Sequence, residues 1–194
     1  MYYSTTYLSP LGKITLACDA CGKNLVGLWL GGGKDFSEPG LWLEGQKYYQ
    51  GTLKEALIEK DAVPLFDIAK KWLDRYFSGQ KPDVAELPLA PQGNAFRQGV
   101  WEILCTIPYG EVITYGSIAK KMAVKLQKER MSSQAVGGAV GHNPISIIIP
   151  CHRVVGANGS LTGYAGGIEK KIKLLELEGV DMSGFFIPQK GTAL

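Results

Sequence analysis

Prolines and a glycine interrupt the middle of this chain. Pro82, Pro88, Pro91 and Gly93 fall within residues 81–93. Such a run neither continues a helix nor pairs inside a sheet, because proline lacks a backbone N–H and glycine favours turns. A chain of 194 residues can form one large domain or two small ones. We therefore predict a boundary near residue 90, with domains at 1–90 (including the linker) and 91–180, and a tail at 181–194.

The first half has the pattern of a small α/β domain. Two β-rich runs between residues 14 and 30 are separated by D-A-C-G-K-N, which predicts a hairpin. Residues 44–60 are mixed and predicted to be helical in part. Residues 64–77 predict an amphipathic helix, because apolar residues recur at spacings of three and four. That face is formed by Leu65, Ile68, Ala69, Trp72, Leu73 and Tyr76.

The second half is predicted to be mainly helical. Thr114 can cap a helix from Tyr115 to about Met122, and Ser132 or Ser133 can cap the next one. Two short helices joined by a turn suggest a helix-turn-helix. I-S-I-I-I at 145–149 predicts buried extended chain, and a last helix is expected from 168 to 178. A first helix of this half has an apolar face of Phe96, Val100, Trp101, Leu104 and Cys105.

Charge and cysteine content narrow the class of protein. Residues 1–91 hold 10 Lys+Arg against 11 Asp+Glu, a net of −1, and residues 92–194 hold 11 against 7, a net of +4. A basic half suits a protein that approaches phosphates. Four irregularly spaced cysteines predict no disulfide scaffold but a reducing, cytoplasmic location. Neither a signal peptide nor a membrane span is expected.

Cys151 stands beside His152, one of only two histidines. A thiol is a good nucleophile only as thiolate, and histidine is the usual group that helps it ionise near neutral pH. Neighbouring side chains diverge by roughly 100° on a helix, so we expect a bridging water rather than direct contact. Glu178 is the best candidate to orient the ring, since it shares a helix flank with Leu174 and Leu175. The alternative is a buried structural cysteine.

The helix predicted after Ser132 has few large side chains, because it contains Ala135, Gly137, Gly138 and Ala139. Glycine inside a helix costs about 1 kcal/mol relative to alanine. Two in succession indicate that something comes close to the backbone. Tight packing on a neighbouring helix and close approach of a nucleic acid in the minor groove both remain open.

The other cysteines suggest no chemistry. Cys18-x-x-Cys21 resembles half of a zinc site, but a tetrahedral site needs four ligands and both histidines lie in the other half of the chain. Cys105 lies on an apolar helix face and is expected in the core. We expect no metal and no cofactor.

Five ordered blocks of the second half resemble one family. V-I-T-Y-G-S-I-A, A-V-G-G-A-V-G-H-N-P, I-I-I-P-C-H-R-V-V, L-T-G-Y-A-G-G and L-E-L-E-G-V are similar to the O6-alkylguanine-DNA alkyltransferases over residues 92–180. S-P-L-G-K-I and R-Y-F-S-G in the first half resemble the family more loosely. The resemblance implies a ribonuclease H-like α/β domain followed by a helical, winged-helix-like domain with a helix-turn-helix.

The resemblance also implies a role for individual residues. Cys151 matches the alkyl acceptor, His152 its water-linked base and Glu178 the carboxylate that orients the base. Asn143 matches the residue that braces the active-site turn, and Tyr115 the one that pushes the target phosphate and protonates guanine N3. The residues matched to substrate binding are Val154, Val140, Pro144, Tyr164, Ala165 and Lys171. Those matched to DNA binding are Thr114, Tyr115, Gln134, Ala135, Gly137 and Gly138.

The implied function is single-turnover DNA repair. A monomer would flip O6-alkylguanine, and possibly O4-alkylthymine, out of double-stranded DNA and move the alkyl group to its own cysteine. Three other classes are weighed against this one: a lesion-binding protein without transfer, a Cys-His-Glu hydrolase and a transcriptional regulator. The first lacks the acceptor that Cys151 provides. No further DNA-binding domain is apparent to favour the regulator.

The glutamine at position 134 departs from the family pattern, which usually has an arginine there. Glutamine can hydrogen-bond the base left without its partner, but it carries no charge and stacks less well. We predict that Gln134→Arg strengthens DNA binding or speeds repair of an O6-methylguanine duplex, measured in single-turnover kinetics. An unchanged rate and affinity would count against this interpretation of residue 134.

Overall fold

The computed structural model describes residues 1–31, 53 and 57–188. The chain forms two compact units. The first comprises Met1–Gln92 and Pro144–Ser146, and the second Gly93–Asn143 and Ile147–Leu194. Each unit is considered by itself below.

A four-stranded sheet forms the first unit. Strands β1 (Tyr2–Ser9), β2 (Gly12–Asp19), β3 (Leu25–Leu30) and β4 (Leu57–Glu59) are arranged in the order β3-β2-β1-β4. The β1–β2 and β2–β3 pairs are antiparallel, whereas β4 runs parallel to β1. The predicted hairpin is therefore confirmed as β2 and β3. Residues 44–60 were predicted to be helical in part. Of these, the structure describes only Leu53 and residues 57–60, and Leu57–Glu59 form strand β4.

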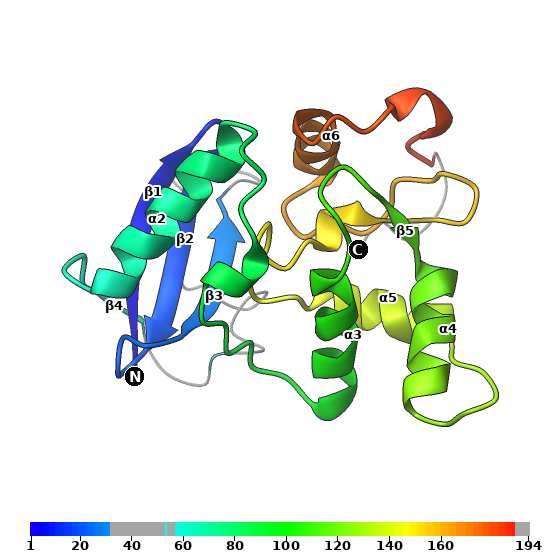
Figure 1. Ribbon diagram of the computed structural model, residues 1–194, viewed down its shortest axis with the longest axis horizontal. Coiled ribbons are helices and arrows are strands. Elements are labelled where there is room, and N and C mark those ends of the chain that lie inside the picture. Colours follow the sequence, from blue (N-terminus) through cyan, green and yellow to red (C-terminus); the bar gives the residue numbers. More distant parts are fainter. Residues whose placement is uncertain (32–52, 54–56, 189–194) are drawn as a thin grey trace. The chain divides into compact units, whose positions relative to one another are not determined.

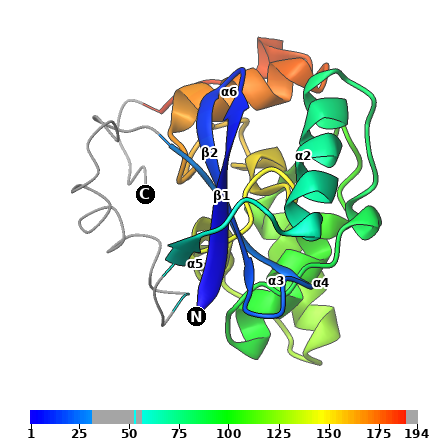
Figure 2. The same ribbon diagram turned by 90° about the vertical axis from the view of Figure 1, so that its left-hand side faces the viewer.

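Helix α2 (Pro64–Phe77) covers one face of this sheet, as Figures 1 and 2 show. Pro64 occupies its first turn, where the missing N–H has no intrahelical partner to lose. The predicted helix is confirmed, but one residue of the predicted face is wrong. Ile68 is 51% exposed, and Phe66 is fully buried in its place. The buried stripe consists of Leu65, Phe66, Ala69, Trp72, Leu73 and Tyr76.

Two other segments of the chain join the outer edge of β3. Leu25 exchanges backbone hydrogen bonds with Pro88 and Ala90. Leu28 donates to the Pro144 carbonyl and accepts from the Ser146 amide, at 2.8 and 3.0 Å. The chain thus leaves the second unit after Asn143, pairs with β3 and returns at Ile147.

The second unit is mainly helical. Its elements are α3 (Ala95–Cys105), β5 (Ile113–Thr114), α4 (Tyr115–Lys125), α5 (Ser133–Gly141), β6 (Val154–Val155) and α6 (Ile168–Leu177). Side-chain oxygens of Asn94, Thr114 and Ser132 cap α3, α4 and α5. The capping predicted for Thr114 is therefore confirmed, and Ser132 is the cap of α5. Helix α4 extends one turn beyond the predicted Met122.

The segment 145–149 is buried as predicted, but it is not extended. Ile145 makes one bridge with Leu28, and the chain then turns at Ile147, whose φ is +69°. That left-handed conformation is rare for a β-branched residue. Packing of the isoleucine side chains outweighs their preference for strands. The turn leads directly into Cys151–Arg153, a short 3-10 helix.

The parallel pair β5–β6 positions the elements around this 3-10 helix. Ile113 pairs with Val154, and Thr114 with Val155. Strand β6 follows Cys151–Arg153 directly, and its Val155 pairs with Thr114. Tyr115, the first residue of α4, comes immediately after Thr114.

None of the described helices is long and apolar enough to cross a membrane.

The buried indole of Trp101 connects α3 to α5, because its Nε1 donates to the Ala139 carbonyl at 2.9 Å. Trp101→Phe leaves this carbonyl buried without that donor, so we expect a loss of about 1–3 kcal/mol in the free energy of unfolding. Urea titration measures it. Val124→Ala, at a residue 79% exposed, is the control and should change stability by less than about 0.5 kcal/mol. Equal effects of the two substitutions would contradict the role given to the indole.

Candidate active site

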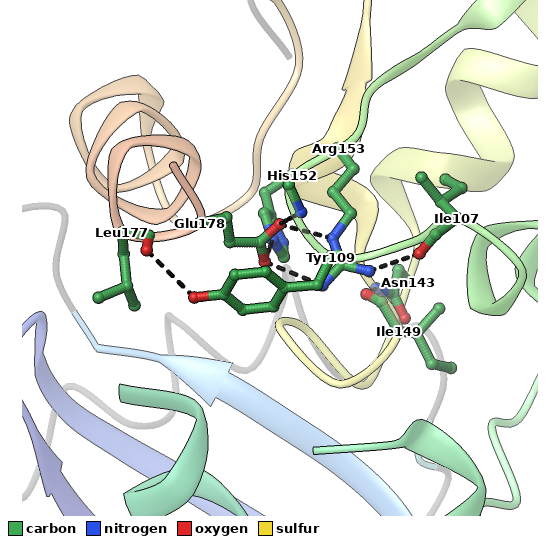
Figure 3. A network of polar contacts seen from close by, with 9 residues as sticks. Ile107, Tyr109, Asn143, Ile149, His152, Arg153, Leu177 and Glu178 are labelled. Atoms are coloured by element: carbon green, nitrogen blue, oxygen red, sulfur yellow. Dashed lines mark hydrogen bonds and ion pairs between the residues drawn. The ribbon is translucent and has the colours of Figure 1, made fainter. Parts of the chain in front are cut away.

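A buried carboxylate is the centre of the candidate site. Glu178 follows the last turn of α6 and its side chain is fully buried. Its Oε1 accepts from His152 Nε2 at 2.8 Å and from Arg153 Nη2 at 2.9 Å. Its Oε2 accepts from Arg153 Nε at 2.8 Å and from the Gly110 amide at 3.1 Å. Figure 3 shows these contacts converging on the carboxylate.

These contacts determine the charge of Glu178 and the tautomer of His152. Burial acts to raise the pKa of Glu178, but hydrogen bonds from His152 and Arg153 hold it well below its usual range. The ionised carboxylate can only accept, so His152 Nε2 must carry the proton. Burial lowers the pKa of His152 despite the neighbouring carboxylate. The ring is therefore neutral at pH 7, and Nδ1 has a lone pair.

Arg153 is the residue that the sequence analysis missed. Besides its paired bonds to Glu178, its Nη1 donates to the Ile107 carbonyl at 2.6 Å, and its guanidinium lies 5.7 Å from the Tyr109 ring centroid. Tyr109 in turn donates to the Leu177 carbonyl. The available signal was an arginine between His152 and two valines, because a charge in an apolar run needs a buried partner.

The thiol of Cys151 is buried, with 4% of the residue exposed. Asn143 Nδ2 donates to its Sγ at 3.1 Å and to the Ile149 carbonyl at 2.7 Å. One amide therefore connects the thiol to the turn that precedes it. That Asn143 braces the active-site turn during the reaction stays a prediction.

A buried lysine contacts the backbone of the segment that follows Cys151–Arg153. Lys171 is fully buried, and its Nζ donates to the carbonyls of Val154 at 2.5 Å and Thr162 at 2.8 Å. Burial lowers its pKa to about 8, and the neighbouring Cys151 acts in the opposite direction. The Thr162 carbonyl also accepts from Tyr115 Oη at 3.2 Å. Burial raises the pKa of Tyr115, which keeps its phenol protonated.

The remaining predicted residues are spread over both units. Tyr164 is buried with its ring edge-on to His152, at 6.4 Å between centroids, whereas Ala165 is exposed. Val140 is buried in α5, and Pro144 belongs to the first unit. On α5, Gln134 and Ala135 are exposed. A Cβ on Gly138 would meet nothing within 4 Å, and one on Gly137 would only touch the Tyr115 ring. Tight helix packing therefore does not explain the two glycines.

The other three cysteines lie elsewhere. Cys18 is buried in β2, Cys21 is exposed in the following turn and Cys105 ends α3 half-buried. All four cysteines are free thiols. No group of three or more candidate metal ligands occurs within the described parts of the chain.

Comparison with known proteins gives the same assignment for both halves. Residues 1–91 match the family model "6-O-methylguanine DNA methyltransferase, ribonuclease-like domain", and residues 95–180 match its "DNA binding domain". A methylated-DNA–protein-cysteine methyltransferase of Methanosarcina acetivorans is 40% identical over 92% of this chain and 99% of its own length. The chain belongs to the methylated-DNA–protein-cysteine methyltransferase family. The predicted family is thus confirmed.

Other relatives and solved structures agree with this membership. The methyltransferase of Haemophilus influenzae is 38% identical, over 91% of this chain and 86% of its own length. The crystal structure of the Mycobacterium tuberculosis O6-methylguanine methyltransferase has a TM-score of 0.69 and 38% identity, covering 92% of this chain and 93% of that one. The Mycobacterium tuberculosis OGT in complex with DNA has a TM-score of 0.68 and 37% identity, covering 91% of each chain. The predicted fold class, a ribonuclease-like α/β domain followed by a helical DNA-binding domain, is confirmed.

The neutral His152 predicts how stability depends on pH. Its folded pKa lies below the ordinary value of 6.5. As pH falls through that value the unfolded chain takes up a proton that the folded chain does not, so stability falls with acidification. Between about pH 7.5 and 5.5 we expect the free energy of unfolding to drop by up to about 1.4 kcal/mol. Urea titrations at both pH values measure it.

Two variants separate His152 from other titrating groups. His142 is exposed, so His142→Gln should retain the pH dependence, whereas His152→Gln should reduce it. Glu178 has a lowered pKa and adds stability that is lost only at more acidic pH, below about 4.3. An identical pH dependence in the His152→Gln variant would show that this histidine titrates normally.

Proposed function

We propose that this protein repairs DNA by transferring an alkyl group from O6 of guanine to Sγ of its own Cys151, and that each molecule acts once. The observation that carries the proposal is the placement of the thiol in a chain of this family. Cys151 receives an N–H from Asn143 and immediately precedes the His152–Glu178 pair. This arrangement also favours a reactive over a structural cysteine.

Thiol activation begins at His152. Because Glu178 fixes the proton on Nε2, the Cys151 proton passes to Nδ1, through a bridging water. The resulting imidazolium is stabilised by the Glu178 carboxylate. The thiolate is stabilised by the Asn143 amide and by the positive charge of Lys171.

The transfer step balances without a cofactor. Sγ forms a bond to the alkyl carbon while the bond from that carbon to O6 breaks, and the electron pair stays on the guanine. The phenol of Tyr115 donates a proton to N3 of the departing guanine. The proton that His152 took from the thiol then returns to the Tyr115 oxygen, so that the base, the phenol and the imidazole all end neutral. The product thioether has no acyl or phosphoryl bond that water could attack readily. The protein is therefore consumed.

The base is held by backbone groups and apolar walls. The carbonyls of Cys151 and Val154 accept from the guanine amino group, and the amide of Ala165 donates to O6. The Val154 carbonyl already accepts from Lys171, but a carbonyl oxygen has two lone pairs and can accept twice. Val140, Pro144 and Tyr164 supply apolar surface, as the family resemblance implies.

DNA approaches the face of α5 that carries Gly137 and Gly138. Flipping the nucleotide costs a few kcal/mol of stacking and pairing, which phosphate contacts can offset. Gly137 and Gly138 leave room for the backbone of the duplex, and Gln134 and Ala135 are exposed beside them. Thr114 and Tyr115 begin the neighbouring α4. A minor-groove approach and activity on O4-alkylthymine are parts of this proposal.

The free thiols support a cytoplasmic location. A reducing compartment preserves a nucleophilic cysteine in a chain that has three other free thiols. The domain limits 1–90, 91–180 and 181–194 and a monomeric state are proposed with it.

Stoichiometry tests the proposal. Incubation with excess duplex containing O6-methylguanine should add at most one methyl group per protein, found by intact mass and located in the Cys151 peptide. Cys151→Ser should take none, whereas Cys105→Ser should take one, since Cys105 ends α3 and makes none of the described site contacts. Repair of more than one equivalent would indicate turnover, as in a hydrolase. Binding without any mass change would indicate a lesion-binding protein.

A further inference from the structure

The chain after α6 folds back onto a loop of the active site. Asp181 caps the short 3-10 helix Met182–Gly184, and Phe186 then pairs with the loop that follows β6. The Leu161 amide donates to the Phe186 carbonyl at 2.8 Å, and the Phe186 amide donates to the Gly159 carbonyl at 3.2 Å. We name residues 181–186 the strap and residues 156–167 the closing loop. Both can be followed in Figure 1.

The strap also buries apolar side chains against the closing loop. Leu161 is buried in a cluster with Val155 and Leu175, and Met182 and Phe185 of the strap pack against that cluster. Leu161 is thus fixed twice, through its backbone amide and through its side chain. The strap is therefore part of the packing of the closing loop.

The two segments pass each other closely at Gly159. This residue has φ of +84°, and a Cβ there would lie 2.2 Å from the Gly184 carbonyl oxygen. That distance is far inside van der Waals contact, so any other residue would push the strap away. The close approach therefore requires glycine.

The closing loop also contacts two residues of the candidate site. Thr162, the residue after Leu161, accepts through its carbonyl from both Lys171 and Tyr115. Consecutive Cα atoms are held about 3.8 Å apart. A shift of Leu161 away from the strap therefore moves the carbonyl on which the Lys171 ammonium and the Tyr115 phenol both depend.

We propose that the strap is a positioning element that sets the closing loop for base binding, acting through Thr162 on Tyr115 and Lys171. The inference rests on the proposed function and extends it to a segment that lies beyond residue 180, where the match to the DNA-binding domain ends. The strap does not act on the thiol itself. The hydrogen bonds described above for Glu178, His152 and Asn143 are all made with residues outside the strap.

Full-length variants at Phe186 isolate the strap. Phe186→Pro removes the N–H that bonds to Gly159, and residue 185 already has an extended conformation that a following proline accepts, with φ −113° and ψ 150°. Phe186→Ala removes the same ring but keeps the N–H, so it is the matched control. Gly159→Ala disturbs the same contact from the closing loop, because the added Cβ would clash with the Gly184 carbonyl oxygen. Gly12→Ala controls for backbone strain, since Gly12 has φ of +100° and open space around it.

Two reagents separate base binding from thiol chemistry. The rate of benzyl transfer from O6-benzylguanine reports on both, whereas the rate of carbamidomethylation by iodoacetamide reports on the thiol alone. Both are followed by mass spectrometry in the Cys151 peptide, because the exposed Cys21 would react with iodoacetamide as well. Loss of one hydrogen bond should slow benzyl transfer in Phe186→Pro by about fivefold relative to Phe186→Ala. Gly159→Ala should be slowed likewise relative to Gly12→Ala, with iodoacetamide rates unchanged within about twofold.

Equal benzyl-transfer rates in Phe186→Pro and Phe186→Ala would overturn the inference. So would a parallel fall of both reactions, since it would mean that the strap only supports the fold. Hydrogen exchange at the Leu161 amide gives an independent measure, and unchanged protection in Phe186→Pro would also contradict it. A wild-type protein that reacts with iodoacetamide but takes no alkyl group from O6-benzylguanine or methylated DNA would instead refute the proposed function.

Discussion

The buried ion pair between Glu178 and Arg153 is the interaction on which the rest of the site depends. Glu178 follows the C-terminal end of α6, where the helix dipole disfavours a negative charge. A buried carboxylate without partners would cost several kcal/mol. Arg153 supplies two donors and its charge, while Gly110 and His152 supply the remaining contacts. The tautomer of His152 thus follows from its hydrogen bond to one member of this ion pair.

Local patterns in the sequence predicted most of the elements of this fold. The hairpin, the helix from Pro64 and the caps at Thr114 and Ser132 each depend on spacing or on a single side chain, and the structure contains them. Ile68 was wrongly predicted to be buried, and residues 145–149, although buried as predicted, were wrongly predicted to be extended. In both cases the sequence pattern indicated burial or strand propensity, whereas packing against distant residues determined which side chain is buried and where the chain turns.

In the candidate site, too, local patterns predicted some residues, and others depend on contacts between distant segments. Helix periodicity placed Glu178 on the inward flank of α6, and its contact with His152 agrees with that expectation. Arg153 was not recognised, because its partners Ile107 and Glu178 come from segments far apart in the sequence. The role of Lys171 followed only from resemblance, since no periodicity shows that its ammonium reaches two carbonyls. The chemical roles themselves stay predictions.

Asn143 and Asn158 differ in the residue that follows each of them, and this difference determines how readily each one deamidates. An asparagine loses its amide mainly when the next backbone nitrogen attacks the side-chain carbonyl to form a cyclic imide. Pro144 has no N–H, so this route is closed at Asn143, whose amide donates to the thiol. Asn158 is exposed and followed by Gly159, which leaves the route open. Spontaneous deamidation would therefore add a negative charge to the closing loop, while the donor to Cys151 is preserved.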